Sequence, residues 1–449
     1  MSYNVGLVSL GCAKNLVDSE IMLGLIERGS YTITEDHSKA DIIIINTCGF
    51  IESAKEESID TILQLGQYKE NGNLKALIAT GCLSERYKDE LLNEIPELDA
   101  VVGTGDYENI IQIIEDTLKG EKVCAYGHID YSFDESLPRR ISTPKYTAYV
   151  KIGDGCDNHC TYCIIPYLRG KYRSRKLEDI KREVEQLVNN GVKEIIIIAQ
   201  DITQYGIDLY EKHSLPMLLR ELEKIEGLRW IRLLYVYPEN IGEDLIDVIK
   251  NSKKILHYLD IPLQHTEDSV LKKMARRTTK TKIINLINTL RREIPDIIIR
   301  STIITGFPGE SEEEFEAMVE TLKDLQIDRL GVFPYSLEEG TPAALLGGQI
   351  EEGVKIRRQE QILEMQQDIS LSHNESQVSK IIEVLIEGAT DDPNTFVGRS
   401  YMDAPEIDGY VYVHSQKRLE EGDLCVVRIV DALEYDLIGE IVHGDELTK

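Results

Sequence analysis

The 449-residue sequence has no apolar run close to the ~20 residues that a membrane-spanning helix needs. Its first residues, Met1 to Asn4, also lack the basic and apolar regions of a secretory signal. These absences argue against an integral membrane protein and predict a cytoplasmic location. Disulfides are rare in that reducing compartment, so the eight cysteines are expected to be thiols or metal ligands.

Positive charge is also scarce, because 50 Lys and Arg residues face 79 Asp and Glu residues, for a net charge of -29. A chain this acidic gains no general attraction to phosphate, which makes nucleic acid a poor default partner and a basic protein a better one. Aromatic residues are few, at 6%, but 42% of the residues are apolar, which is typical of an ordinary globular chain. The length allows about three domains.

Three thiols with the spacing CxxxCxxC follow an apolar run, Thr147 to Ile152: Cys156, Cys160 and Cys163. A structural zinc ion takes four ligands, whereas a 4Fe–4S cluster held by three thiolates keeps one iron open for a substrate. The count of three therefore favours the cluster. A zinc site that borrows His159 or Cys124 as its fourth ligand is the alternative.

The first 140 or so residues alternate β-branched runs with helical patterns, which predicts a parallel sheet flanked by helices. The expected strands are 4–9, 41–46, 75–80 and 98–103, with helices at 52–68 and 84–93 between them. Three further cysteines each follow a strand beside a glycine: Cys12, Cys48 and Cys82. Ligands bind beyond the carboxyl ends of parallel strands, so we expect these thiols to converge, although three buried structural cysteines are the alternative. Cys124 and Cys425 have no such setting and are interpreted as structural.

After a proline-containing linker, 132–144, the alternation resumes with a longer period. Six strands are expected, at 146–152, 194–199, 231–236, 258–262, 297–304 and 329–335. Repeated βα units predict a barrel of parallel strands whose chemistry lies on the loops after the strands, which is where CxxxCxxC stands. A long helix, 350–375, then leads to short alternating strands in 377–442, which indicate a small β-barrel.

These features together resemble the radical S-adenosylmethionine (SAM) methylthiotransferases. Tyr162 just before the last cysteine of CxxxCxxC, the three upstream thiols and a C-terminal barrel of the TRAM type carry the resemblance. Within that family, the branch that modifies a ribosomal protein is the most similar. The matching stretches are residues 9–20, 155–166, 169–170, 200–201, 205–206, 258–265, 305–310, 335–336, 338–341 and 403–409. Ala13 departs from the proline expected there and affects no ligand.

The resemblance implies three modules of an α/β chain. Residues 1–135 would be a parallel-sheet methylthiotransferase domain, 142–372 a radical SAM core built as a partial (β/α) TIM-type barrel, and 375–445 a small antiparallel TRAM barrel. Two 4Fe–4S clusters are implied, one on Cys156, Cys160 and Cys163 and the other on Cys12, Cys48 and Cys82. The resemblance also implies that SAM binds near Tyr162, Gln200, Asp201 and Thr305. Lys14 and Arg169 stand beside the thiols and are candidates for neutralising charge there.

The implied reaction is methylthiolation of the β-carbon of an aspartate in ribosomal protein S-twelve of the small subunit, with one SAM as methyl donor and a second as radical source. An electron donor such as flavodoxin is also implied. Residues 376–449 carry 16 acidic and 6 basic residues, about -10 in net charge, which suits a basic ribosomal protein better than RNA. The alternatives are a tRNA methylthiotransferase acting on isopentenyladenosine in the anticodon loop, and an iron–sulfur carrier or scaffold.

Overall fold

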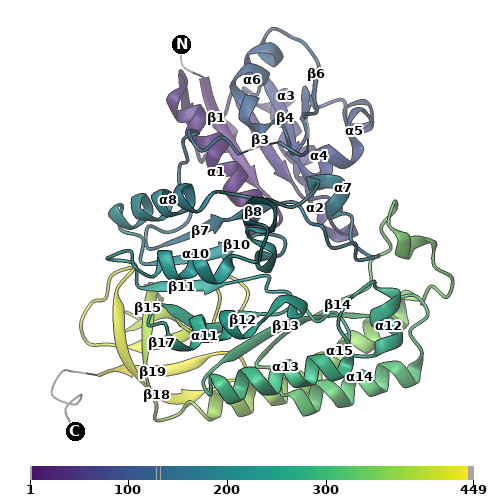
Figure 1. Ribbon diagram of the computed structural model, residues 1–449. Helices are drawn as coiled ribbons and strands as arrows, with labels where there is room; N and C mark the ends of the chain where they lie inside the picture. The colour runs from purple at the N-terminus through teal and green to yellow at the C-terminus, as the bar shows by residue number, and fades with distance from the viewer. Residues whose placement is uncertain (1–2, 128, 132, 443–449) are drawn as a thin grey trace.

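The computed structural model describes residues 3–127, 129–131 and 133–442, and it places three modules in contact with one another (Figure 1). The N-terminal module lies at the top of the view, the core lies in the centre, and the C-terminal barrel packs at the lower left. Ser132 of the expected linker and residues 443–445 of the expected TRAM domain lie outside the described residues. No helix of the described residues is long and apolar enough to cross a membrane.

The N-terminal module is a six-stranded, all-parallel sheet with the order β2-β1-β3-β4-β5-β6. Its strands are β1 (Tyr3–Ser9), β2 (Tyr31–Ile33), β3 (Ile42–Thr47), β4 (Ala76–Gly81), β5 (Ala100–Val102) and β6 (Val123–Ala125). Its helices are α1 (Ala13–Arg28), α2 (Glu52–Gly66), α3 (Tyr68–Asn71), α4 (Cys82–Tyr87), α5 (Asp89–Glu94) and α6 (Ile110–Leu118). The predicted parallel sheet is confirmed. The sequence analysis missed β2 and β6, which are three-residue edge strands with few buried side chains.

The core is a second parallel sheet with the order β14-β13-β12-β11-β10-β7. Its strands are β7 (Thr147–Lys151), β10 (Glu194–Ile198), β11 (Trp230–Leu233), β12 (Ile255–Asp260), β13 (Ile298–Thr305) and β14 (Arg329–Pro334), which confirms the six expected strands. A short antiparallel pair of strands, β8 (Gly153–Asp154) and β9 (Arg173–Ser174), follows β7. The helices are α7 (Ile165–Arg169), α8 (Leu177–Asn189), α9 (Ile207–Tyr210), α10 (Leu215–Leu222), α11 (Glu243–Asn251), α12 (Asp268–Lys273), α13 (Lys280–Glu293) and α14 (Glu312–Leu325).

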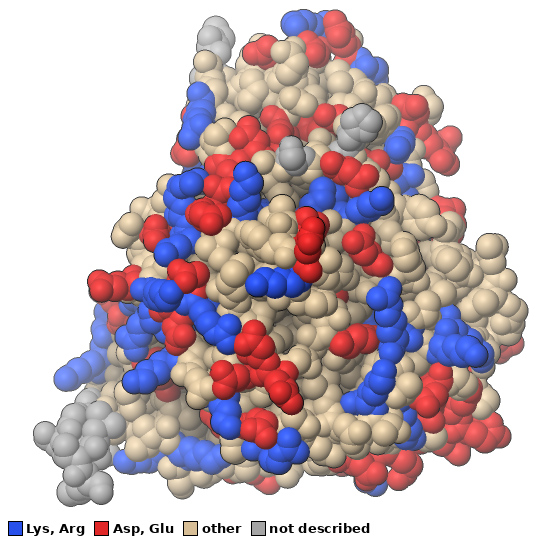
Figure 2. Space-filling view, in the orientation of Figure 1, with Lys and Arg blue, Asp and Glu red and all other residues tan. Residues whose placement is uncertain are grey.

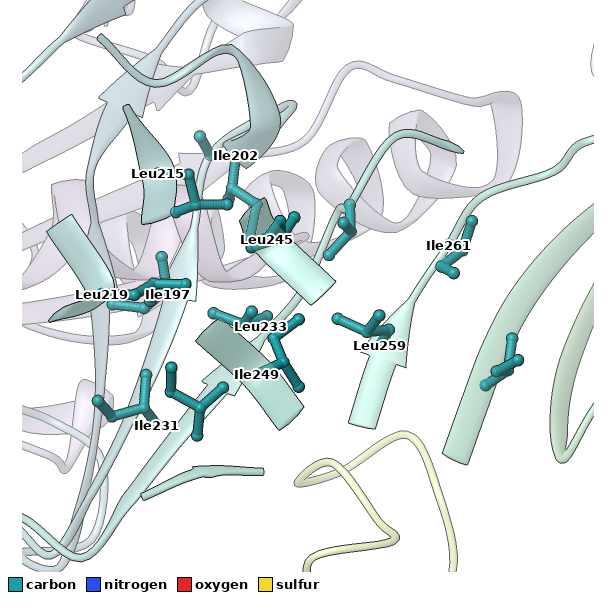
Figure 3. Close-up of a cluster of buried hydrophobic side chains, with 14 of the residues drawn as sticks. Ile197, Ile202, Leu215, Leu219, Ile231, Leu233, Leu245, Ile249, Leu259 and Ile261 are labelled. Atoms are coloured by element: carbon teal, nitrogen blue, oxygen red, sulfur yellow. The ribbon is translucent and has the colours of Figure 1, made fainter. Parts of the chain in front are cut away.

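The two faces of this core sheet bury different partners because side chains alternate along a strand. In β10, Ile195 and Ile197 pack with the helices, whereas Ile196 and Ile198 point to the opposite face. Figure 3 shows the helical side, where Leu219 and Ile249 lie close to side chains of the strands. The opposite face packs against the C-terminal barrel, so the near-continuous apolar strand Glu194–Ile198 is buried on both sides.

The long helix α15 (Glu352–Glu375) leads into a closed barrel with the order β15-β16-β17-β19-β18. Its strands are β15 (Ile381–Ala389), β16 (Thr395–Ser400), β17 (Val411–His414), β18 (Leu424–Ala432) and β19 (Leu437–Ile441). The pairs are antiparallel except β17 with β19, which run parallel. The expected small barrel is confirmed.

Buried ion pairs fix the barrel to the core sheet. Glu194 on β10 accepts from Arg232 on β11 at 2.9 Å and from Arg399 on β16 at 2.6 Å, and all three side chains have zero exposure. Arg329 on β14 also donates to Asp403 of the barrel at 2.9 Å. Because a buried charge is costly unless it is paired, these contacts hold the barrel in one place against the sheet.

Candidate metal and cofactor sites

The three N-terminal thiols lie at the carboxyl ends of adjacent strands. Cys12 follows β1, Cys48 follows β3 directly, and Cys82 follows β4 as the first residue of α4. The loops are in contact, because a Cβ on Gly11, whose φ is +85°, would lie 2.8 Å from Cβ of Cys48. Cys82 Sγ lies 3.8 Å from Oδ1 of Asn15 at the start of α1. The fold therefore brings together three residues that are far apart in the sequence.

Cations beside this first set of thiols alter their protonation. Burial by itself would raise the pKa of Cys12, but Lys14 and Arg169 outweigh it and lower that pKa below its ordinary value. Burial raises the pKa of Cys48 to about 12, helped by the nearby Cys82. Burial also raises the pKa of Cys82, which Arg169 opposes. Iron binds thiolates, so loading this set would release protons from the buried thiols.

The second set of thiols lies in the loop after the β8 strand. Hydrogen bonds shape this loop: Cys156 N donates to Gly170 O at 3.1 Å, and Cys163 N donates to Cys160 O at 3.0 Å. Burial raises the pKa of Cys156 to about 12, and burial together with Cys160 raises the pKa of Cys163. Lys14 opposes the rise at Cys163, so its charge acts on a thiol of each set.

Each set offers three thiols, which is the donor set that a cluster with one open iron takes. Among the described residues, no group of three or more Cys, His, Asp or Glu side chains could hold a metal ion as the structure places them, so the fit is one of donor chemistry. The surroundings suit anionic groups and a polar cofactor. Nη1 of Arg276 and Oε1 of Gln200 are buried without a hydrogen-bond partner in the described part of the chain. The residues therefore fit two clusters and SAM.

Three of the four predicted SAM-binding residues, Tyr162, Gln200 and Asp201, lie in or contact the segment that carries the second set. Tyr162 packs against an apolar cluster that includes Phe307 and Tyr335. Gln200 donates to Asp154 Oδ1 at 2.7 Å, which leaves its carbonyl free for a ligand. Thr305 is fully buried at the end of β13 and donates to Lys355 O at 3.1 Å.

Asp201 offers no free carboxylate oxygen to a ligand, because its carboxylate accepts hydrogen bonds from the protein itself. It accepts from Asn158 Nδ2 at 2.9 Å, from Gln204 Nε2 at 3.1 Å and from the Thr203 backbone at 3.0 Å. Asn158 belongs to the CxxxCxxC loop. Asp201 therefore fixes the position of that loop, and its contact with SAM stays a prediction.

A buried charge network joins the two sets of thiols. Arg169 pairs with Asp18 and Asp154 at 2.9 Å each, and its Nη2 donates to Asn15 Oδ1 at 2.6 Å. Lys151 also pairs with Asp18 and Asp154. Asp154 accepts from Gly155 N at 2.9 Å, directly before Cys156, so the network runs from one set to the other.

Sequence reasoning missed several residues of this region. Tyr237 places its hydroxyl 3.9 Å from Cys160 Sγ, and the Arg276 guanidinium lies 4.3 Å from the Tyr237 ring centroid. Tyr235 lies under Lys14, whose Nζ is 3.4 Å from the ring centroid. None of the three stands in a recognisable spacing, so only the folded chain identifies them. His265 has zero exposure and faces Glu310 at 3.3 Å, which favours a structural role.

Of the two residues named for the zinc alternative, Cys124 lies on β6 of the N-terminal sheet and His159 lies within the CxxxCxxC loop, and both are exposed. The neighbours of Cys124 are Asp89 and Tyr126. Cys425 lies on β18 of the barrel and pairs with Val384 in the sheet register.

Comparison with known proteins agrees with this arrangement of modules. The Radical SAM superfamily matches residues 150–322, the TRAM domain matches 378–442, and the Uncharacterized protein family UPF0004 matches 4–103. Among solved structures, the radical SAM methyltransferase TsrM from Kitasatospora setae shares the fold, with a TM-score of 0.56 and 16% identity over 77% of each chain.

Curated relatives match over nearly the full length. The ribosomal protein uS12 methylthiotransferase RimO of Thermoanaerobacter sp. (strain X514) is 56% identical over 97% of this chain and 99% of its own. That of Clostridioides difficile (strain 630) is 53% identical over 98% of this chain and 99% of its own. The chain thus belongs to the RimO family of ribosomal protein uS12 methylthiotransferases, within the radical SAM superfamily.

Proposed function

We propose that this protein attaches a methylthio group to the β-carbon of an aspartate in ribosomal protein uS12. The observation that carries the proposal is the pair of three-thiol sets in neighbouring modules, joined by one buried network through Asp18, Asp154 and Arg169. Cys156, Cys160 and Cys163 would hold one 4Fe–4S cluster, and Cys12, Cys48 and Cys82 the other. When bound, the clusters and SAM supply reductive cleavage of SAM to a radical and the sulfur and methyl group to be transferred.

The chain's own residues position these groups and keep water away from them. Asp201 and Asn158 hold the CxxxCxxC loop, and Gly170 O accepts from Cys156 N. Cys82 packs with Ile164 and Leu168 of the core, so the first set is enclosed by apolar contacts between modules. Such enclosure suits radical chemistry, because a radical next to an unactivated C–H bond must meet its sulfur partner before it reacts elsewhere.

A division of labour between the sets can be tested by single substitutions. Anaerobically reconstituted protein should hold about eight irons per chain, since each 4Fe–4S cluster contains four. Cys48→Ala should lower this to about four and abolish methylthiolation while SAM cleavage continues. Cys160→Ala should also lower iron but should abolish SAM cleavage. Loss of both activities in Cys48→Ala would contradict the division.

The acidic C-terminal module supports a protein substrate rather than RNA. Residues 376–449 carry about -10 in net charge, and ribosomal proteins are basic, so the field of the barrel attracts such a partner and repels phosphate. On the face shown in Figure 2, acidic and basic side chains are intermixed. Incubation with purified uS12, with assembled small subunits and with tRNA, followed by mass measurement, decides between the substrates. A mass increase on tRNA alone would overturn the proposal.

The same proposal places the reaction in the cytoplasm, where ribosomes are found, with an electron carrier such as flavodoxin as the reductant. An iron–sulfur carrier would transfer its clusters to an acceptor without cleaving SAM. Detection of 5′-deoxyadenosine from reduced protein and SAM therefore separates the enzyme from a carrier.

A further inference from the structure

The three cations nearest the thiol sets are not equally available to a ligand. Arg169 is 3% exposed and its charge is committed to Asp18 and Asp154. Arg276 lies beside Tyr162, Tyr237 and Cys160, so its charge acts at the second set of thiols only. Lys14 is 7% exposed, and no carboxylate in the described part of the chain forms an ion pair with it. Within the described residues, Lys14 is therefore a largely buried cation that no carboxylate pairs.

Tyr235 holds the side chain of Lys14 in position. The Tyr235 ring lies 3.4 Å from Nζ, which is a cation–π contact. Tyr235 has φ of +62°, a strained value for a tyrosine, and hydrogen bonds fix it on both sides. Its N–H donates to Asp260 at 3.1 Å, and its carbonyl accepts from Ile202 N at 3.1 Å. Strain kept at one residue in this way is typical of a functional site.

Lys14 also lies in the region between the two sets of thiols, where the reacting carbon of a substrate has to be. It stands two positions after Cys12 of the first set and packs on Tyr235. The Tyr235 carbonyl accepts from Ile202 N, and the neighbouring Asp201 holds Asn158 of the CxxxCxxC loop, so these contacts lead from Lys14 to the second set. Cys12, Cys163 and Tyr235 are only partly buried, so this region is accessible although Lys14 itself is nearly enclosed. A carbon that receives sulfur from one set and loses hydrogen to the chemistry of the other must lie between the two.

A largely buried lysine without a carboxylate partner is costly, and a substrate carboxylate is the group that would pair with it. We propose that Lys14 is the specificity-determining residue that binds the carboxylate of the target aspartate. The β-carbon is one bond away from that carboxylate, so an ion pair with Lys14 places the reacting carbon between the thiol sets. This inference rests on the proposed function, because it assumes an aspartate substrate.

The test compares Lys14→Met with a matched control. Met keeps the length and apolar stem of Lys but removes the charge. Lys119→Met makes the same change on the exposed α6 end, where Lys119 pairs only with Asp116 of its own helix and is 60% exposed. Reconstituted proteins with SAM are titrated with a labelled uS12 peptide that spans the aspartate, and with the same peptide carrying asparagine at that position. Iron content is measured on every protein.

We expect wild type and Lys119→Met to bind the aspartate peptide about 10- to 100-fold more tightly than the asparagine peptide, the range for a charged hydrogen bond. Lys14→Met should hold wild-type iron but bind both peptides with equal, weak affinity. Lys14→Arg should recover part of the preference. Equal affinity of wild type for the two peptides overturns the inference, and so does loss of iron in Lys14→Met, which would assign the cation to a cluster. Failure of wild type to modify uS12 would instead overturn the proposed function.

Discussion

Arg86 on α4 donates through Nη1 to Oε2 of Glu338 at 2.7 Å, across the boundary between the N-terminal module and the core. Lys55 on α2 reaches the same carboxylate oxygen at 3.1 Å, and Glu338 is 2% exposed. Arg86 also donates to Gly49 O at 2.9 Å, next to Cys48. One buried carboxylate of the core thus holds both α2, which follows Cys48, and α4, which begins with Cys82.

Removal of this carboxylate should loosen the two modules. Glu338→Ala removes the one buried carboxylate that Lys55 and Arg86 share, so we expect the free energy of unfolding to fall by about 3 kcal/mol. Chemical denaturation measures the change. The control is Arg220→Ala, which breaks an exposed pair with Asp244 and should cost less than about 1 kcal/mol. An equal cost for the two variants would show that Glu338 does not join the modules.

Stability should fall in acid because of Glu194. Arg399 and Arg232 outweigh burial and lower the pKa of Glu194 from 4.5 to about 2. A depressed pKa gives stability that is complete above about pH 4.5 and is lost as the pH falls towards 2. The shift corresponds to about 3 kcal/mol, since each pKa unit is about 1.4 kcal/mol.

The matching variant is Glu194→Gln, which has no charge to lose. At pH 7 it should be less stable than wild type by about 3 kcal/mol, and the difference should shrink below about pH 4.5. Urea titrations at several pH values give both curves. A difference that stays constant down to pH 3 would rule out titration of Glu194 as the cause.

Gly81 should be essential for the first set of thiols. Its φ is +95°, and a Cβ there would lie 2.6 Å from the carbonyl oxygen of Thr47 and would overlap Asn46. We expect Gly81→Ala to cost more than the ~1–2 kcal/mol of backbone strain alone and to lose about half of the iron. Gly120→Ala has a similar φ of +88° and meets nothing within 4 Å, so it measures the strain by itself.

Cys124 should contribute nothing to metal binding. Its neighbours are Asp89 and Tyr126 on the edge of the N-terminal sheet. Cys124→Ser should therefore keep about eight irons per chain and wild-type activity. Elemental analysis after anaerobic reconstitution is the measurement. Loss of metal in this variant, or zinc in place of iron, would instead support the four-ligand alternative.

The sequence by itself determined the order of modules and the strands that carry the thiols. Apolar runs such as Glu194–Ile198 and Ile42–Thr47 identify buried parallel strands, and a cysteine beside a glycine after a strand is visible without a structure. Parallel strands expose their carboxyl ends at one edge, which is why the convergence of Cys12, Cys48 and Cys82 was predictable. The short edge strand β6 could not be predicted, because three residues that are all at least partly exposed carry no periodic signal.

Only the tertiary structure decided which charged side chains form ion pairs, and with which partners. Lys14 and Arg169 looked alike in the sequence, yet Arg169 pairs with Asp18, 151 positions away, while Lys14 meets an aromatic ring. Glu194 likewise finds Arg399 across 205 positions. Ion-pair partners are chosen by the packing of modules, and a charge has no periodicity that reveals its partner. For this reason the sequence identified the thiols, and only the fold identified Lys14 as the cation near them that no carboxylate of the described residues pairs.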